Sequence, residues 1–509
     1  MAASDLFKSR HDSGESQLVA RRLAADLDTP VSAFLKLAGD RPFAFLLESV
    51  EGGDQLGRYS IIGMDPDAVW RADGEHASLN RSFTDDPLTF EQQDAAPLDS
   101  LKAFIEESRV APPPDGAPLP PPMAAGVFGY LGYDIARQIE RLPAPPPRYA
   151  DTPDAIMMRP TLIAVFDNVR QEISLFSPAR PTAGVDAQTA FEAAEARLDA
   201  AVARLSNDAG LARPAPRRVD GEPQRIQPTS SMTPDAYCAA VKAAKEKIFA
   251  GDIFQAVLSQ RFEAPFPAPP FSLYRALRRT NPSPFLFYLN FGDHQLVGSS
   301  PEILVRVRSG EITIRPIAGT RPRGKTPAED AAYEGDLLAD PKERAEHLML
   351  LDLGRNDVGR SAKIGSVTVT DAFQVERYSH VMHIVSNVVG ELADGAHPVD
   401  AVAAGFPAGT VTGAPKIRAM EIINELEVAA RGPYAGAIGY FSADGSVDTC
   451  ITLRTGMVKD GVLYVQAGAG IVADSDPQAE HEECRNKARA LFAAAEAALA
   501  METGAGEAQ

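Results

Sequence analysis

Strand-like runs dominate this sequence, and many follow one another with no helix between them. The runs FLFYLNF, HQLVGSSPEILVRVR and EITIRPI succeed each other between residues 285 and 317, as AGAIGYF, TCITLRTGMV and LYVQAGAGIV do between 435 and 472. Strands joined without a crossover helix pair antiparallel, because a parallel connection needs a long crossover. Further runs are FAFLLESV, TLIAVFDN and SVTVT. The sequence therefore predicts extensive antiparallel sheet.

Helical patterns occur in blocks among these strands. Residues 233–252 begin with a Thr N-cap and stop at a glycine, and residues 326–360 are mostly helical with an interruption near Asp340-Pro341. Two more helices are expected in APKIRAMEIINELE and PQAEHEECRNKARALFAAAEAALA. Strands and helices in separate blocks predict a layered α+β fold.

A segment rich in proline, serine and charge, residues 211–234, has no apolar period. We interpret it as a linker between an N-terminal domain (1–210) and a C-terminal domain (235–509). A second proline-rich stretch, 110–122, is a polyproline-like loop within the first domain.

The net charge of −19 over 509 residues argues against nucleic acid or an anionic membrane as partner. No apolar run approaches the roughly 20 residues of a membrane span, and the polar N-terminus lacks a signal-peptide core. Three cysteines without a paired motif fit a reducing compartment. A cytoplasmic protein is expected, in which an anionic substrate would need local arginines, backbone amides or a metal.

The stretch TIRPIAGTRPRGK, residues 313–325, places an uncharged Ala318 before a Gly-Thr turn and three cations after it. A basic loop of this kind suggests an anionic ligand.

Two Glu-x-x-Glu pairs, Glu343 with Glu346 and Glu480 with Glu483, each lie on one face of a predicted helix. Carboxylates are the ligands that Mg²⁺ uses, one or two at a time. The alternative for each pair is a solvated charged face.

Two glycine-containing segments could bind an anion through backbone N–H groups. One is Gly468-Ala469-Gly470, where a strand is expected to end; the alternative there is a tight turn. The other carries Thr410 and precedes a helix, but Ala414-Pro415 before Lys416 rules out a phosphate-binding Walker loop.

Two histidines, His380 and His383, have a spacing that zinc could use, but the sequence has no matching Cys or His cluster. A packed histidine or a lone proton-transfer histidine is the other interpretation. Farther upstream, Glu48 and Ser49 end one strand and Arg58 begins the next, which from chemistry alone is a hairpin.

Seven motifs in order resemble the large, chorismate-using subunit of anthranilate synthase, and the resemblance covers nearly the whole chain. It implies a layered β-sandwich flanked by helices. The motifs are PIAGTRPRG, DPKERAEHLMLLDLGRND, ERYSHVMH, PAGTVTGAPK, GPYAGAIGYF, DTCITLR and VQAGAGIVADSDPQAEHEECRNKA.

Two positions separate the activities of the wider family. Aminodeoxychorismate synthase, which this sequence also resembles, has a nucleophilic lysine where Ala318 stands, and an alanine cannot attack the ring. Isochorismate and salicylate synthases have a water-activating lysine at the position of Gln255, an amide without basicity. The resemblance therefore implies ammonia as the nucleophile.

The resemblance also assigns roles to residues around the ring. It implies that Glu302 protonates the departing C4 hydroxyl and that His383 transfers a proton in the later loss of pyruvate. The metal carboxylates would be Glu346 and Glu483, with Glu343 and Glu480 acting directly or through metal-bound water. The residues implied to contact chorismate are Gly319, Thr320 and Thr410 at the ring, Arg454, Tyr434, Gly468, Ala469 and Gly470 at the enolpyruvyl carboxylate, and Lys416 as added positive charge.

The implied reaction converts chorismate and ammonia to anthranilate and pyruvate, the first step of tryptophan biosynthesis. None of the three cysteines lies in a nucleophile elbow, so a separate glutamine amidotransferase subunit (component II) is expected in a hetero-oligomer. Tryptophan is the expected feedback inhibitor. Its implied contacts are Glu48, Ser49, Arg58, Pro284, Phe285 and Leu286. The alternatives are an aminodeoxychorismate synthase and a catalytically silent, tryptophan-sensing subunit.

Overall fold

The computed structural model describes residues 4–51, 55–114, 116, 119–207, 225–378 and 381–503. Up to residue 207 it contains α1 (Asp5–Asp12), β1 (Gln17–Ala24), α2 (Pro30–Leu37), β2 (Ala44–Glu51), β3 (Gln55–Asp73), β4 (His76–Asn80), β5 (Glu91–Gln93), α3 (Pro97–Glu107), the 3₁₀ helix η1 (Pro122–Ala124), β6 (Gly126–Leu131), the 3₁₀ helix η2 (Tyr133–Gln138), β7 (Ala155–Asp167), β8 (Glu172–Ala179) and α4 (Ala187–Leu205).

The elements after residue 225 are β9 (Thr229–Ser230), α5 (Pro234–Phe249), β10 (Gln255–Pro265), α6 (Pro270–Thr280), β11 (Phe285–Asn290), β12 (His294–Ser300), β13 (Ile303–Arg308), β14 (Glu311–Ile314), β15 (Ile317–Pro322), α7 (Pro327–Ala339), α8 (Pro341–Gly359), β16 (Thr368–Arg377), β17 (Val381–Glu391), α9 (Pro398–Gly405), the 3₁₀ helix η3 (Gly409–Val411), β18 (Gly413–Ala414), α10 (Lys416–Leu426), β19 (Ala437–Ser442), β20 (Val447–Ile451), β21 (Thr455–Lys459), β22 (Val462–Ile471) and α11 (Pro477–Thr503).

Every strand pair among the described residues is antiparallel, as the sequence predicts. The helix boundaries also agree with the predicted signals. The Thr233 side chain accepts a hydrogen bond from the backbone N–H of Ala236, and Asp340 caps α8 where the long helix was expected to break.

The strands form two layers that share the long pair β3–β7. The first layer runs β1, β8, β7, β3, β2, β11, β12, β21, β22, β10, and the second runs from β7 through β6, β19, β20, β13 and β14 to β17 with β15 and β16. The β3–β7 register shifts between Pro66 and Ala68, next to Asp65, whose φ is +51°. A strand pair that bends in this way can pass from one layer to the other.

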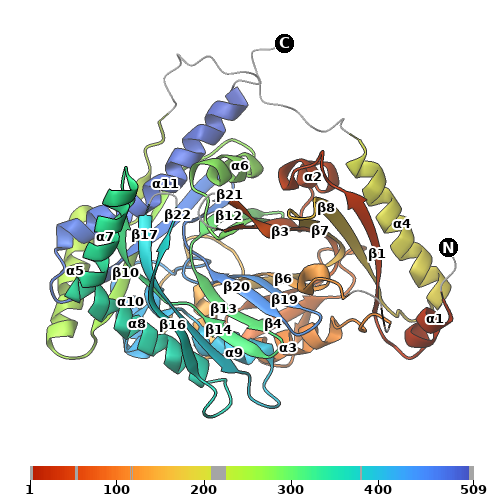
Figure 1. Ribbon diagram of the computed structural model, residues 1–509, viewed down its shortest axis with the longest axis horizontal. Helices are drawn as coiled ribbons and strands as arrows, with labels where there is room; N and C mark the ends of the chain where they lie inside the picture. The colour runs from red at the N-terminus through yellow and green to blue at the C-terminus, as the bar shows by residue number, and fades with distance from the viewer. Residues whose placement is uncertain are drawn as a thin grey trace.

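An apolar core fills the space between the two layers. Phe45 and Leu289 come from the first layer, Phe128 and Ile438 from the second, and the rings of Phe45 and Phe128 stack at 4.6 Å. Helices cover the outer faces: α4, α6 and α11 share a core with the first layer, and α3, α8 and α9 share one with the second. Figure 1 shows these helices on opposite sides of the strands. The predicted helix-flanked β-sandwich is confirmed.

The predicted linker falls largely outside the described residues, which resume at 225. Strands from the two sides of it pair directly: β2 with β11, and β6 with β19. The division at 211–234 into two domains stays a prediction. None of the helices among the described residues combines the length and apolarity that a membrane span needs.

A buried ion pair joins three segments next to this core. The Arg431 guanidinium donates to the Glu427 carboxylate at 2.6 and 2.9 Å and to the carbonyl oxygens of Val411 and Val257, both at 2.7 Å. Glu427 also accepts from the backbone N–H and the hydroxyl of Ser259, both at 2.8 Å. Each guanidinium nitrogen of Arg431 and each carboxylate oxygen of Glu427 thus has a hydrogen-bond partner, either in the other side chain or in β10 and η3.

We predict that Arg431→Met destabilises the protein by about 3–5 kcal/mol, because it leaves the Glu427 carboxylate buried without its counter-ion. Urea unfolding measures the change. The matched control is Arg418→Met, which breaks partly exposed pairs with Glu421 and Asp252 and should cost about 1 kcal/mol or less. Equal losses in the two variants would contradict the assignment.

Candidate active site

His383 lies on β17 opposite Thr320 of β15, where a bulge at Gly319 interrupts the pairing. Gly319 has φ +69°, a conformation that favours glycine, and its carbonyl oxygen lies 2.8 Å from His383 Nδ1. Since a carbonyl only accepts, Nδ1 carries the proton, and within the described residues Nε2 has no hydrogen bond. Burial lowers the pKa of His383, so the imidazole is neutral near pH 7 and able to accept a proton. His380 lies outside the described residues.

Glu302 is a buried acid held by Thr410. The Thr410 hydroxyl donates to Glu302 Oε1 at 3.0 Å, and burial raises the pKa of Glu302 to about 8. The carboxyl is therefore protonated near neutral pH, which is the form that a general acid needs. Thr410 lies on η3, so the acid and its partner come from segments more than 100 residues apart.

Arg454 follows β20 with φ +47°. It has no ion pair and no side-chain hydrogen bond in the part of the chain that the structure describes, and burial lowers its pKa. A half-buried guanidinium without a carboxylate partner suits an anionic ligand.

Gly468, Ala469 and Gly470 lie within β22, which continues to Ile471, so the expectation that the strand ends at these residues is wrong. They pair with Ser259, Leu258 and Val257 of β10, while the pairing of β22 with β21 stops at Val465. Among the described strand pairs the second edge of β22 is therefore open at these residues. A side chain at 468 would meet the Tyr434 hydroxyl at 3.0 Å, and one at 470 would meet Gln255 Nε2 at 2.6 Å.

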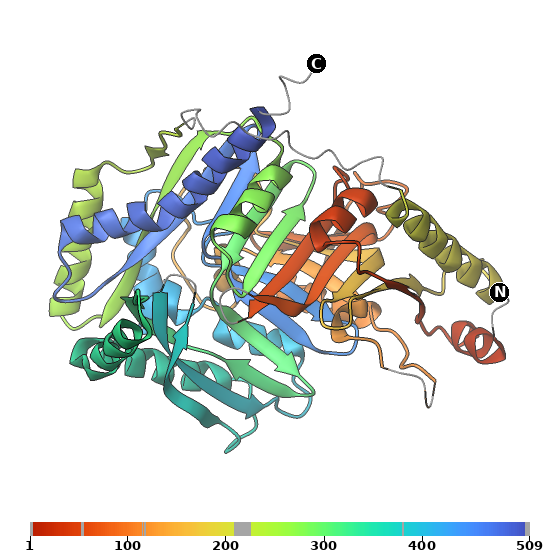
Figure 2. The ribbon, with the colours of Figure 1, turned by 45° about the horizontal axis from the view of Figure 1, so that its top comes forward.

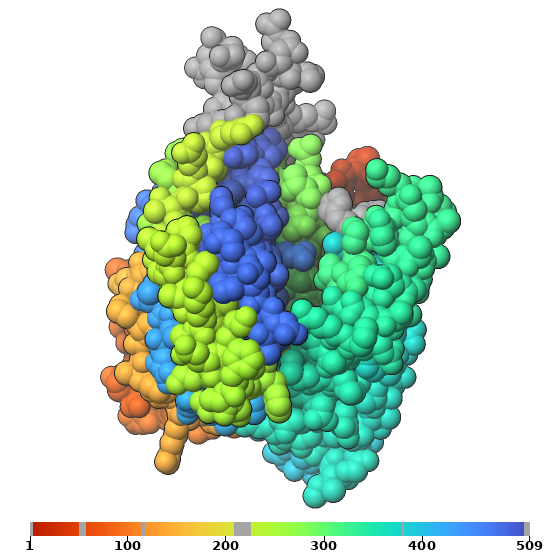
Figure 3. Space-filling view, turned by 90° about the vertical axis from the view of Figure 1, so that its left-hand side faces the viewer, coloured from red at the N-terminus to blue at the C-terminus, as the bar shows by residue number. Residues whose placement is uncertain are grey.

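The four predicted metal carboxylates come from two helices that face each other. Glu343 and Glu346 lie on α8, and Glu480 and Glu483 lie on α11. Figure 3 shows the surface hollowed between α11 and the α7–α8 segment, and Figure 2 shows the two groups of elements on the same side of the molecule. The pKa of Glu346 is raised by burial, then by Glu343, and also by Glu483, and burial followed by the Glu483 charge raises the pKa of Glu480.

These carboxylates have other partners as they stand. Glu343 pairs with Arg321 at 3.2 Å, Glu483 pairs with Lys487 at 2.7 Å, and Glu346 accepts from Gln255 Nε2 at 3.4 Å, while the buried Gln255 Oε1 has no partner. No group of three or more His, Cys, Asp or Glu side chains in the described ranges is arranged to hold a metal ion. Carboxylate oxygens that repel one another suit a divalent cation. To bind it, the glutamate side chains of α8 and α11 would have to move closer together.

Lys487 is a site residue that the sequence analysis missed. Its ammonium bridges Glu483 and the carbonyl oxygen of Gly468, at 2.7 and 2.9 Å. The i,i+4 spacing from Glu483 was visible in the sequence, but the contact with Gly468 depends on how α11 packs on β22.

Two of the three cations that follow the Gly319-Thr320 turn are paired within the protein, and the expectation that this stretch receives an anionic ligand stays a prediction. Arg321 pairs with Asp336, Asp340 and Glu343, and Arg323 pairs with Asp330.

Lys416 is neutralised in the same way. Its Nζ lies 2.9 Å from both carboxylate oxygens of Asp357, and both side chains are buried. The structure therefore gives Lys416 a structural partner and leaves no free charge there for substrate.

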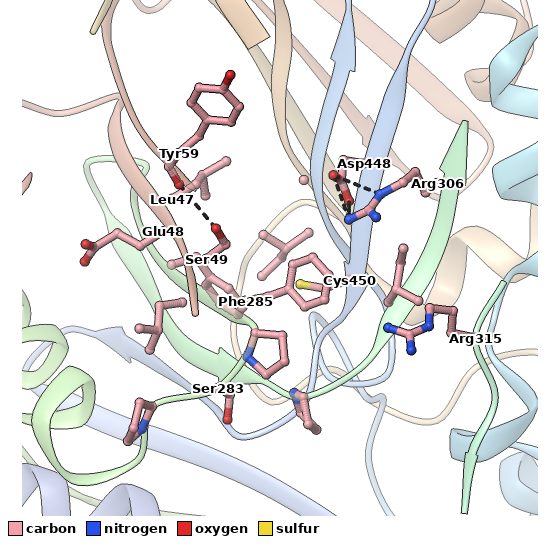
Figure 4. A pocket seen from close by; sticks show the side chains of 18 of the residues that line it. Leu47, Glu48, Ser49, Tyr59, Ser283, Phe285, Arg306, Arg315, Asp448 and Cys450 are labelled. Carbon is pink, nitrogen blue, oxygen red and sulfur yellow. Dashed lines mark hydrogen bonds and ion pairs between the residues drawn. The ribbon is translucent and has the colours of Figure 1, made fainter. Parts of the chain in front are cut away.

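A separate cavity of about 870 Å³ contains all six residues predicted to contact tryptophan among its lining. Figure 4 shows Ser49 and Phe285 on one side of it, and Arg306, Asp448 and Arg315 across from them. Apolar side chains such as Leu47, Phe287 and Ile438 also line it. A pocket of this size and mixed lining is typical of a small-molecule site. The six residues are Glu48, Ser49, Arg58, Pro284, Phe285 and Leu286.

The Glu48 carboxylate is already engaged. It accepts from Arg278 at 2.7 and 3.0 Å and from the Tyr274 hydroxyl, and its side chain is 0% exposed. Figure 4 shows it directed away from the cavity. Arg58 pairs with Asp167 at 3.0 Å. Direct contact between Glu48 and an amino-acid ligand stays a prediction that needs this network to rearrange.

Comparison with known proteins agrees with this geometry. The model of the chorismate binding enzyme family matches residues 44–493. Anthranilate synthase component 1 of Cereibacter sphaeroides is 54% identical over 97% of this chain and 98% of its own, and that of Pseudomonas putida is 48% identical over 94% and 95%.

Solved structures are similar as well. Anthranilate synthase component I from Streptococcus pneumoniae TIGR4 is 37% identical, covers 93% of this chain and 99% of its own, and superposes with a TM-score of 0.73. The menaquinone-specific isochorismate synthase from Escherichia coli, 19% identical with 94% and 95% coverage and a TM-score of 0.70, shares the fold. The chain belongs to the chorismate-binding enzyme family and, within it, to the anthranilate synthase component 1 proteins.

Proposed function

We propose that this chain is the chorismate-using subunit of an anthranilate synthase, a lyase that converts chorismate and ammonia to anthranilate and pyruvate. The observation that carries the proposal is the presence of a buried, protonated Glu302 and a partly buried, neutral His383, with Ala318 at the position where the resemblance implies a nucleophilic lysine in aminodeoxychorismate synthase. An acid and a base with oppositely adjusted pKa values suit an addition followed by an elimination.

In the first step, Glu302 gives its proton to the C4 hydroxyl of chorismate, which leaves as water while ammonia forms a bond to C2. In the second step, His383 Nε2 takes the C2 proton and the bond from C3 to the enolpyruvyl oxygen breaks, so that the leaving enolate takes up a proton at its methylene carbon and becomes pyruvate. The ring becomes aromatic, which drives the second step. Arg454 and Tyr434 hold the enolpyruvyl carboxylate, together with the open edge of β22 at Gly468.

Mg²⁺ is the proposed cofactor. Glu346 and Glu483 would hold it, with Glu343 and Glu480 directly or through water, and when bound it supplies positive charge for the ring carboxylate. Carboxylates that raise each other's pKa support this assignment, because a cation removes their repulsion.

The proposed nitrogen source is a partner amidotransferase, as the name component 1 of the relatives suggests. Cys238 and Cys484 lie in helices α5 and α11, and Cys450 lies in strand β20. Burial raises the pKa of Cys484 to about 11 and raises that of Cys450 further, so neither is a reactive thiolate. The proposal includes a cytoplasmic hetero-oligomer in which tryptophan binds in the 870 Å³ cavity and inhibits.

We predict that the protein forms fluorescent anthranilate from chorismate and ammonium salt when Mg²⁺ is present. Glu346→Gln should lower this rate roughly 10²-fold or more, because a metal-binding charge is lost. Glu482→Gln, which breaks an exposed pair with Arg485 on the same helix as Glu483, is the control and should stay active. A 4-amino product would indicate an aminodeoxychorismate synthase, and absence of product would indicate a silent subunit; either result rejects the proposal.

His383→Met should stop the reaction after ammonia addition, since Glu302 still serves the first step and no base remains for the second. Chromatography of the products is expected to show an amino-substituted ring that retains the enolpyruvyl group. Wild-type anthranilate yield from this variant would remove His383 from the mechanism.

The raised pKa of Glu302 predicts two pH effects. Activity should fall about tenfold per pH unit above pH 8, where the acid loses its proton. The folded-state pKa lies above the unfolded value, so the folded protein binds the extra proton and stability falls as pH rises toward 8, by at most about 1.4 kcal/mol per unit. Urea unfolding of wild type and Glu302→Gln between pH 5 and 8 measures the difference, and parallel curves would mean that Glu302 titrates normally.

A further inference from the structure

Tyr378 contacts both the large cavity and the catalytic histidine. It is among the residues that line the cavity, and its ring meets the His383 imidazole edge-on at 5.5 Å between centroids and 63° between planes. The chain segment from β16 to β17 therefore presents one side of this tyrosine to the proposed regulatory pocket and another to the proton-transfer group.

Cavity residues hold the tyrosine in place. Its hydroxyl donates to Glu376 Oε2 at 3.0 Å, and Glu376 Oε1 accepts from Arg315. Both Glu376 and Arg315 line the same cavity. Glu376 also lies opposite His383 in the pairing of β16 with β17. We call the Tyr378–Glu376–Arg315 contacts the clamp; its Glu376 and the proposed proton-transfer histidine therefore belong to the same strand pair.

The backbone of Tyr378 is fixed as well. Its carbonyl oxygen accepts from Arg323 Nη1 at 2.6 Å, and its N–H donates to the Val381 carbonyl oxygen at 2.8 Å. With the main chain held at both groups, the Tyr378–Glu376–Arg315 chain of contacts is what sets the orientation of the ring.

The ring also lies near the other proposed substrate contacts. Tyr378 acts electrostatically on the Arg454 guanidinium, and Glu302 acts on Tyr378. The Gly319 carbonyl and the Thr320 hydroxyl both contact His383 at Nδ1, at 2.8 and 3.1 Å, so a further neighbour beside the ring is needed to aim Nε2. An edge-on aromatic contact supplies such a constraint.

We propose that Tyr378 is a positioning residue for His383, and that an amino acid bound in the cavity acts on catalysis through Arg315, Glu376 and Tyr378. The inference rests on the proposed function and deepens its regulation. The ammonium and carboxylate of an amino acid compete with the Arg315–Glu376 pair, which releases the Tyr378 hydroxyl and with it the ring beside His383. Inhibition then follows because the bound amino acid favours the released Tyr378 ring, whereas catalysis needs this ring aligned beside His383.

Two substitutions distinguish the effect of the Tyr378 ring from the effect of its hydrogen bond to Glu376. Tyr378→Leu removes the ring and should lower kcat at least tenfold and build up the same amino intermediate as His383→Met. Tyr378→Phe keeps the ring but loses its hydrogen bond to Glu376, so it should accumulate less intermediate than Tyr378→Leu and more than wild type. A general loss of packing would slow both steps alike and would not produce the intermediate. Tyr333→Phe, on exposed α7, is the matched control.

The clamp is tested with L-tryptophan as probe. Tyr378→Phe leaves Arg315 and Glu376 in place and should bind tryptophan by calorimetry about as wild type does. In both Tyr378→Phe and Glu376→Gln the effect of tryptophan on the apparent KM for chorismate should fall at least fivefold. The Glu376→Gln variant and circular dichroism keep the test informative should Tyr378→Leu not fold.

The outcomes are distinct. Wild type that makes no anthranilate rejects the proposed function. Active, tryptophan-inhibited wild type together with fully inhibited Tyr378→Phe and Glu376→Gln overturns the coupling. A folded Tyr378→Leu that makes anthranilate without intermediate overturns the positioning role.

Discussion

The buried ion pair between Arg431 and Glu427 is the interaction on which the site geometry depends. Its hydrogen bonds tie the turn after α10 to β10 and to the end of η3. Gln255 begins β10, Thr410 lies on η3 and Tyr434 follows Arg431, so three site residues from distant segments are fixed by one network. A charged pair costs desolvation energy, which here is offset because each donor has an acceptor. An apolar replacement could fill the space but could not set the register of three backbones.

Most of the cationic side chains around the site form ion pairs with carboxylates of the same chain. Arg321, Arg323 and Lys416 are each paired with carboxylates of the same chain, whereas Arg454 is not paired within the described residues. On the opposite wall the glutamates of α8 and α11 repel one another. In the proposed function, a divalent cation bound among these glutamates would offset their repulsion, and Arg454 would supply positive charge for the other carboxylate of the substrate.

Much of the fold could be predicted from the sequence because its signals are local. Consecutive strand runs give antiparallel pairing, and Thr233 and Asp340 mark helix starts. Pairings between distant segments leave no such signal. The partners of Lys416 and Glu48, namely Asp357 and Arg278, lie 59 and 230 residues away, so neither engaged side chain could be anticipated. The contact between Lys487 and Gly468 has the same origin, because it follows from the packing of a helix on a strand edge.

The cavity and the proton-transfer group share a wall because of how the sandwich is built. Strands β11 and β12 belong to the first layer and β13 to β17 belong to the second, so the short β12–β13 connection passes from one layer to the other. Glu302 lies in this connection, just before β13, and Phe285 at the start of β11 pairs with Ser300 at the end of β12. A shift of β11 would therefore reach the segment that carries Glu302 through the pairing of β11 with β12. Close packing makes such shifts discrete rather than gradual, which is the property that an on–off response to an amino acid requires.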